Sequence, residues 1–207
     1  MRVVRQARAA IYDAAIVRLT ASWYRAVLQR LPSGCRLLDI GMGTGSALLA
    51  NAGLLHQRDL YVTGVDIDAD YVRRCQAAVR RADLGARVTP RLESIYDHQG
   101  GPYGAAYFSA SFMLLPDPPA ALRHVCGLLA PEARLYFTQT FEHARSPSME
   151  RLKPLLRTLT TIDFGKVTYE DDFRRALADG GLTVASIETL HPGRRRSGIL
   201  AVAQPRR

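Results

Sequence analysis

The sequence predicts an α/β fold in which a seven-stranded, mostly parallel sheet carries helices on both faces and its last strand runs antiparallel. Short apolar runs alternate with segments of helical periodicity along most of the chain, a pattern typical of parallel strands joined by crossover helices. The apolar run Leu37–Ile40 passes directly into glycines at positions 41, 43 and 45, as a buried strand passes into a tight turn. Only His191–Ser197 separate the last two predicted strands. This connection is too short for a parallel crossover, so these two strands are expected to pair antiparallel.

The individual elements are predicted from these runs and from the residues that end them. The strands cover residues 35–40, 60–66, 87–92, 103–109, 133–140, 182–190 and 198–203. The helices cover residues 44–55, 69–82, 116–129 and 167–179. Pro118 and Pro119 suit a helix start because their missing N–H groups would be unpaired there. The helix over 69–82 is expected to turn one apolar face inward, consisting of Tyr71, Val72, Cys75, Ala78 and Val79.

The chain is expected to form a single domain over residues 1–207, which is long enough for one α/β domain with a full core. Residues 1–31 are predicted to be an N-terminal helical cap, because their apolar side chains recur at close to 3.6-residue spacing. Residues 141–166 are predicted to be an insertion. The alternative for residues 1–31 is an organelle transit peptide, since the segment is rich in Arg and Ala and Asp13 is its only acid. The scarcity of Ser in this segment favours the helical cap.

The composition, 47% hydrophobic and 23% charged, is typical of a globular protein. No apolar run approaches the roughly 20 residues that cross a bilayer, so no membrane span is expected. The net charge of +9 is carried mainly by scattered Arg residues, and it permits an anionic substrate or nucleic acid without requiring either. The cysteines are odd in number and lack C-x-x-C spacing: Cys35, Cys75 and Cys126. They predict neither a disulfide framework nor a zinc site, and a reducing, cytoplasmic location is expected.

The glycine turn is the most informative motif in the chain. Gly41, Gly43 and Gly45 form G-x-G-x-G, whereas the dinucleotide fingerprint G-x-G-x-x-G would need glycine at Ser46. No lysine stands at the phosphate-binding position of a P-loop. Together with Asp39, the motif resembles motif I of the class I S-adenosylmethionine-dependent methyltransferases. This resemblance implies a Rossmann-like sheet, S-adenosyl-L-methionine as the cofactor and S-adenosyl-L-homocysteine as its product.

The resemblance also implies roles for acids that follow the next strands. Asp66 ends the second strand, where the family's acid binds the ribose hydroxyls, although an N-cap of the next helix is an alternative role. Glu93 and the backbone N–H of Ser94 follow the third strand, where the adenine amino group and ring nitrogen are bound, with Asp97 as an alternative to Glu93. Ile67 and Ile95 are candidate covers for the adenine, and an ordinary core position is the alternative for each of them. Asp39 is expected to orient the glycine turn or to bind the cofactor's amino group through water, and the alternative is a structural hydrogen-bond acceptor.

The exits of the fourth and fifth strands are expected to meet both cofactor and acceptor. Ser109 and Ser111 are candidates to bind the methionine end of the cofactor, and Phe112 is a candidate wall beside the reacting methyl. A plain apolar segment is the alternative for Phe112 and the residues after it. Candidate bases near the acceptor, next to or within the predicted insertion, are Glu142, His143 and Tyr169.

Several chemistries are not supported by the sequence. Asp117-Pro118-Pro119 lies too far past the fourth strand to match the amino-methylases of nucleic-acid bases. No cysteine is placed as a nucleophile, and the carboxylates Asp117 and Glu142 are too few for a metal site. The sequence therefore predicts methyl transfer to an N, O or S atom of a small-molecule metabolite, by a monomer or homodimer. The alternatives are an RNA or protein acceptor, and a non-catalytic cofactor-binding subunit.

Overall fold

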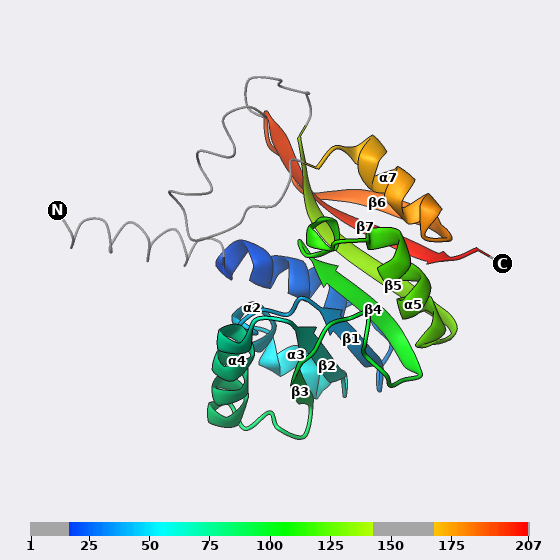
Figure 1. Cartoon of the computed structure of the whole chain (residues 1–207). Helices are drawn as coiled ribbons and strands as arrows, with labels where there is room; N and C mark the ends of the chain where they lie inside the picture. The colour runs from blue at the N-terminus through cyan, green and yellow to red at the C-terminus, as the bar shows by residue number, and fades with distance from the viewer. Residues whose placement is uncertain (1–16, 143–167, 207) are drawn as a thin grey trace.

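The computed structural model describes residues 17–142 and 168–206, which form a seven-stranded sheet with helices packed on both faces (Figure 1). The strands are β1 (Arg36–Ile40), β2 (Tyr61–Asp66), β3 (Val88–Leu92), β4 (Tyr103–Ser109), β5 (Leu129–Glu142), β6 (Leu182–His191) and β7 (Arg196–Pro205). The helices are α2 (Ser46–Leu49), α3 (Ala52–Gln57), α4 (Ala69–Arg81), α5 (Pro118–Gly127) and α7 (Glu170–Asp179), with a 3₁₀ turn η1 (Phe112–Leu114). An N-terminal helix covers residues 17–28 within the described part of the chain.

The strand order β3-β2-β1-β4-β5-β7-β6 confirms the predicted fold class. The five strands β1 to β5 pair in parallel, and β7 runs antiparallel to both of its neighbours, β5 and β6. Strand β6 forms the edge of the sheet, and the antiparallel strand β7 lies inside it, between β5 and β6. The burial patterns explain the arrangement: residues 198–203 of β7 are buried without interruption, whereas β6 is mostly exposed. A continuous apolar run is typical of a strand covered on both faces.

The predicted helix over 44–55 is broken into α2 and α3. The break falls at Asn51, whose buried side-chain amide donates to the carbonyl of Ala47 and, 2.9 Å away, to that of Ala21 in the N-terminal helix. This second bond ties the break to a distant segment, so helical periodicity alone could not predict it. The inner face of α4 also differs from the prediction, because Tyr71 is exposed while Val72 and Cys75 are buried.

Two apolar clusters cover the two faces of the sheet. Leu37 and Leu38 are successive residues of β1 and belong to different clusters, as expected where successive side chains of a strand point to opposite faces. One cluster includes Val27 and Leu28 of the N-terminal helix. The other includes Phe173 of α7 and Leu122 of α5, the two helices that lie on that face of the sheet (Figure 1).

Strand β5 is longer than predicted and takes in Phe141 and Glu142, the first two residues of the predicted insertion. These residues pair with Ser197 and Arg196 of β7 and so belong to the sheet. The rest of the insertion, including His143, lies outside the described residues, as does the first half of the predicted N-terminal cap. None of the helices in residues 17–142 and 168–206 has the length and apolar character needed to cross a membrane.

Candidate active site

The turn after β1 has the backbone geometry that its glycines predict. The φ angles of Gly41, Gly43 and Gly45 are 73°, 59° and 69°, a left-handed backbone conformation that residues other than glycine rarely adopt. A Cβ on Gly41 would lie 2.6 Å from Cβ of Ser111, and one on Gly45 would lie 2.5 Å from Sγ of Cys75. A Cβ on Gly43 would meet nothing within 4 Å. The outer glycines are therefore required for packing, and the middle one borders open space.

Asp66 joins this turn to the end of β2. Its Oδ2 accepts a 2.8 Å hydrogen bond from the N–H of Gly43, and its Oδ1 accepts a 2.9 Å bond from the N–H of Asp68. Asp68 caps α4, since it accepts from the N–H groups of Asp70 and Tyr71, so the alternative role considered for Asp66 belongs to its neighbour. Each carboxylate oxygen has two lone pairs, and the two backbone bonds leave acceptor capacity on both.

Asp39 lies beneath the turn as a buried acid. Its Oδ2 accepts a 2.8 Å bond from the Tyr24 hydroxyl of the N-terminal helix. Its Oδ1 is buried and has no hydrogen-bond partner among the described residues. Burial raises the pKa of the Asp39 carboxyl from 3.8 to about 7, against a lowering by the Tyr24 bond and with a further rise from the charge of Asp66. A buried acid with one unpaired oxygen is well suited to interact with a cation.

The residues predicted to bind adenine follow β2 and β3. The N–H of Glu93 donates to the carbonyl of Asp66 over 3.1 Å, so the two acids lie next to each other at the carboxyl ends of β2 and β3. Ile67 is 78% exposed, as an unoccupied apolar contact would be, whereas Ile95 is 4% exposed and packs in the core. The prediction that Ile95 covers the adenine therefore does not agree with its position. The hydroxyl of Ser94 accepts from the N–H of Tyr96, and no described backbone bond uses the N–H of Ser94.

The serines predicted at the β4 exit both lie near the turn. Ser109 ends β4, and the hydroxyl of Ser111 donates to the carbonyl of Ile40 at the end of β1. Phe112 differs from its prediction: it is 1% exposed and packs edge-to-face against Phe108, Phe137 and Phe173, with ring centroids 5.5, 5.1 and 5.8 Å away. The alternative, an apolar core segment, describes Phe112 correctly, because its ring is enclosed by other aromatic rings.

Two of the three candidate bases come together at the carboxyl end of β5. The N–H of Glu142 donates to the carbonyl of Thr168 over 3.1 Å, and Tyr169 is the next residue, directly before α7. Glu142 is half-buried. Since β1 and β5 run parallel within one sheet, the carboxyl end of β5 lies at the same end of the strands as the glycine turn. Among the residues that the structure describes, no cluster of three His, Cys, Asp or Glu side chains could hold a metal ion.

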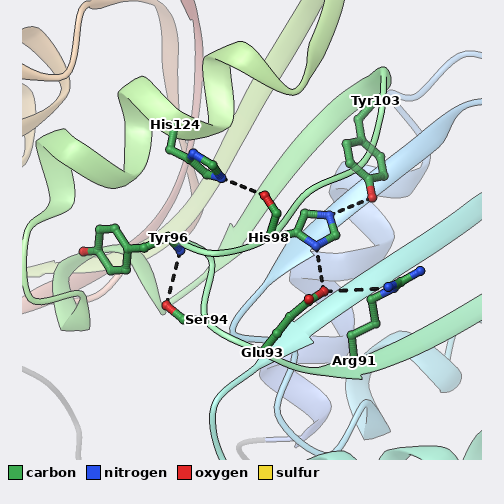
Figure 2. Close-up of polar contacts among 7 residues, drawn as sticks. All are labelled: Arg91, Glu93, Ser94, Tyr96, His98, Tyr103 and His124. Atoms are coloured by element: carbon green, nitrogen blue, oxygen red, sulfur yellow. Dashed lines mark hydrogen bonds and ion pairs between the residues drawn. The ribbon is translucent and has the colours of Figure 1, made fainter.

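Sequence reasoning missed two residues that contact the predicted site. The sequence suits Tyr24 to an aromatic lid or to the core but does not predict its bond to Asp39, which depends on how the N-terminal helix packs. His98 reads as an isolated loop histidine, yet it is fully buried and its Nδ1 lies 2.6 Å from Oε1 of Glu93 (Figure 2). No signal in the sequence identifies these two residues, because their contacts with Asp39 and Glu93 are visible only in the structure.

The sheet order, the left-handed glycine turn and the acid bonded to that turn define a Rossmann-like α/β enzyme of the class I methyltransferase type. The model of the methyltransferase domain family matches residues 11–187, and the chain belongs to this family.

The individual proteins that resemble this chain are distant relatives in sequence. The ubiquinone biosynthesis O-methyltransferase of Xanthomonas axonopodis pv. citri (strain 306) is 30% identical over 110 residues, an alignment that spans 52% of this chain but only 44% of that enzyme. The [4+2]-cyclase SpnF has a TM-score of 0.73 at 16% identity, over 89% of this chain and 81% of its own. Geranyl diphosphate C-methyltransferase from Streptomyces coelicolor A3(2), solved with Mg²⁺, geranyl diphosphate and S-adenosyl-L-homocysteine, has a TM-score of 0.70 at 14% identity, over 91% and 77%. These two structures support the fold alone. One is a cyclase and the other a methyltransferase, so the fold does not determine the reaction.

Proposed function

We propose that this methyltransferase moves the methyl group of S-adenosyl-L-methionine to an N, O or S atom of a small-molecule metabolite and releases S-adenosyl-L-homocysteine. The single observation that carries the proposal is the bond between the Gly43 amide and Asp66. It fixes an acid with spare acceptor capacity beside a backbone turn that borders open space. That pairing suits a ligand with vicinal hydroxyls and a flexible chain lying against bare backbone.

The cofactor contacts proposed from this geometry run along the sheet edge. Asp66 accepts from the ribose hydroxyls through the lone pairs that its backbone bonds leave over. Glu93 accepts from the adenine amino group, the N–H of Ser94 donates to the ring, and Ile67 packs on the ring face. At the other end, the turn at 41–45 carries the methionine part, and Asp39 lies below it as the partner for a positive charge. Ser109 is placed to donate to the methionine carboxylate, whereas the single hydroxyl proton of Ser111 is already donated to the carbonyl of Ile40 and holds the turn in place.

The chemistry is displacement at the sulfonium methyl, with the reactivity supplied by the cofactor and alignment by the protein. The bond between sulfur and methyl breaks as the bond from methyl to the acceptor atom forms. A hydroxyl or protonated amine must lose a proton, whereas a thiolate need not. Glu142 and Tyr169 are the described candidates to accept that proton, and His143 is the third candidate, outside the described residues.

A small-molecule acceptor is supported by the O-methyltransferase named among the relatives. The chain matches less than half of that relative, so its acceptor is not carried over. A hydroxylated metabolite is the first acceptor class to test.

An RNA or protein acceptor is favoured by one observation, the exposed arginines 194–196 in the β6–β7 turn. Arg196 pairs in register with Glu142, which brings this turn to the active edge of the sheet. Retention on an RNA column that falls steeply with salt would support that reading. Salt-independent turnover of a metabolite would support the small-molecule acceptor.

The proposal is tested by incubating the enzyme with a metabolite extract and a methyl-labelled donor, followed by mass identification of the labelled product. A single labelled metabolite is the expected result. Label on RNA or protein instead would favour the alternative acceptor. Tight S-adenosyl-L-homocysteine binding with no labelled product from any extract would favour a non-catalytic cofactor-binding subunit.

A further inference from the structure

A buried histidine outside the predicted site is held at both ring nitrogens. His98 lies in the loop between β3 and β4 and is fully buried. Its Nδ1 is 2.6 Å from Oε1 of Glu93, and its Nε2 is 2.9 Å from the hydroxyl of Tyr103. Its carbonyl oxygen is 2.8 Å from Nε2 of His124 on α5. Figure 2 shows the imidazole between Glu93 and Tyr103, so backbone and ring are fixed together.

The direction of these bonds follows from the chemistry of the groups. An ionised carboxylate only accepts, so the Nδ1 of His98 must carry the proton and donate to Glu93. In the neutral ring Nε2 then accepts, and the Tyr103 hydroxyl donates to it. The chain of donors therefore runs from Tyr103 through His98 to Glu93. A Cβ on Gly100 would lie 3.0 Å from the Tyr103 hydroxyl and 3.3 Å from Nε2 of His98, so glycine leaves the room that this contact needs.

The arrangement divides the two oxygens of Glu93. Oε1 bonds His98 and is the oxygen that Arg91 approaches, at 4.0 Å. No described residue bonds Oε2, and the Glu93 side chain is 27% exposed. The backbone N–H of Glu93 bonds the carbonyl of Asp66, which places it next to the proposed ribose acid. Oε1 is thus held inward, while Oε2 has no partner in the described part of the chain.

A tyrosine, an imidazole and a carboxylate in series have the order of a nucleophilic triad, but the location excludes that role. Tyr103 is the first residue of β4 and is 3% exposed. The first residues of the parallel strands lie at the amino-terminal ends of these strands, and the glycine turn lies at their opposite, carboxyl ends. A nucleophile there would meet no substrate, so the series acts on Glu93 and not through Tyr103.

We propose that His98 is a positioning residue that orients Glu93, so that Oε2 accepts a hydrogen bond from the exocyclic amino group of adenine and rejects a purine with oxygen at that place. This inference rests on the proposed function, because it needs a purine beside Glu93. A carboxylate that is already oriented loses little side-chain freedom when the ligand binds. A 6-oxo purine would set an acceptor against this fixed acceptor, and Glu93 could not turn away to relieve the repulsion.

The test compares the Kd of S-adenosyl-L-homocysteine with that of S-inosyl-L-homocysteine, its 6-oxo analogue, by calorimetry. The wild-type enzyme is expected to prefer the adenosyl ligand about 10- to 100-fold, as one charge-assisted hydrogen bond supports. His98→Leu is expected to reduce that preference about 10-fold, and His98→Asn, which keeps a donor near the position of Nδ1, is expected to restore most of it. Equal preference in His98→Leu and wild type would overturn the proposal.

Glu93→Gln gives the sharper result. With the ring in its wild-type tautomer, in which Tyr103 donates to Nε2, the Nδ1–H of His98 donates to the amide oxygen of the introduced glutamine and holds it inward. The NH₂ group then points outward, which inverts the preference toward the inosyl ligand. Combining Glu93→Gln with His98→Leu frees the amide to turn, and the inversion should disappear. An inversion that persists in the double variant would show that His98 does not set the orientation.

Tyr103→Phe covers the case in which His98→Leu fails to fold, since it removes only the donor to Nε2. It should weaken the adenosyl preference by a smaller factor, and an unchanged preference in Tyr103→Phe would then count against the proposal. A wild-type enzyme that binds neither ligand would refute the proposed function itself. One that binds both equally would leave the proposed function intact and overturn only the role of His98.

Discussion

Oδ2 of Asp66 accepts a 2.8 Å hydrogen bond from the N–H of Gly43. The bond joins the turn after β1 to the carboxyl end of the neighbouring strand β2, so the bare backbone and the acid form one unit. The other oxygen of Asp66 bonds the N–H of Asp68 at the start of α4. Two backbone bonds fix the orientation of this carboxylate before any ligand binds, which reduces the side-chain entropy that binding would cost.

Replacing Asp66 with Asn should weaken S-adenosyl-L-homocysteine binding about 10- to 100-fold, which corresponds to roughly 1.5–3 kcal/mol for a charge-assisted hydrogen bond. An amide has one acceptor oxygen in place of two, so the Gly43 and Asp68 N–H groups and the ribose compete for it. Calorimetric titration measures the change.

The matched control is Asp70→Asn in the first turn of α4, four residues after Asp66. Asp70 is exposed and pairs with Arg73, an i,i+3 surface pair of the kind that contributes little. Its replacement should leave the affinity unchanged. Similar losses in both variants would point to a general effect of charge and against ribose binding by Asp66.

Alanine substitutions in the glycine turn should separate binding from packing. All three positions have positive φ, which costs an alanine about 1–2 kcal/mol. Gly45→Ala should cost more, because its Cβ would also lie 2.5 Å from Sγ of Cys75, whereas Gly43→Ala meets no atom within 4 Å. Chemical denaturation should therefore rank Gly45→Ala as the less stable variant.

The affinity for the ligand should depend more strongly on Gly43 than on Gly45. Gly43→Ala places a methyl group in the open space where the ligand is proposed to lie, so its loss of affinity should exceed its loss of stability. Combining Gly45→Ala with Cys75→Ala should be less destabilising than the sum of the single changes, since the clash is shared. Strict additivity would mean that Cys75 does not limit the size of residue 45.

The glycine turn and Asp66 could be predicted from the sequence because local signals encode them: an apolar run, alternate glycines and an acid at a strand end. The position of β7 inside the sheet could not, since it depends on pairing between segments far apart in the chain. The same holds for Asn51, whose helix break depends on the carbonyl of Ala21.

Phe112 shows a different limit. Its apolar neighbourhood suits either a wall beside a ligand or a core, and only the positions of Phe137 and Phe173 decide between them. His98 shows the reverse case, in which a residue without any motif gains a role from a carboxylate that the sequence had already singled out.

Asp39 should make stability depend on pH. The pKa of its carboxyl is raised by burial from 3.8 to about 7. Between these values the native state holds a proton that the unfolded chain has lost, so this contribution is fully present below pH 3.8 and is lost as pH rises through about 7. Asp39→Asn removes the titration. From pH 5 to pH 8 the variant should therefore gain stability relative to wild type, on the order of 3 kcal/mol for about two units of pKa.

Urea unfolding of both proteins at the two pH values measures this difference. Other carboxylates titrate alike in wild type and variant, so their contributions cancel in the comparison. A relative stability that does not change with pH would show that Asp39 is already ionised in the folded enzyme at pH 5.

Cofactor binding should release a proton from the same residue. At pH 6 a carboxyl with a pKa of about 7 is mostly protonated in the free enzyme. A bound ammonium or sulfonium group near the unpaired Oδ1 favours the ionised form and lowers that pKa, so the proton leaves as the ligand binds. Calorimetry of S-adenosyl-L-homocysteine binding in buffers of different ionisation enthalpy counts the protons released. The count should approach one for wild type at pH 6 and fall toward zero at pH 9 and in Asp39→Asn. Equal counts for wild type and Asp39→Asn would place the ligand's positive charge away from Asp39.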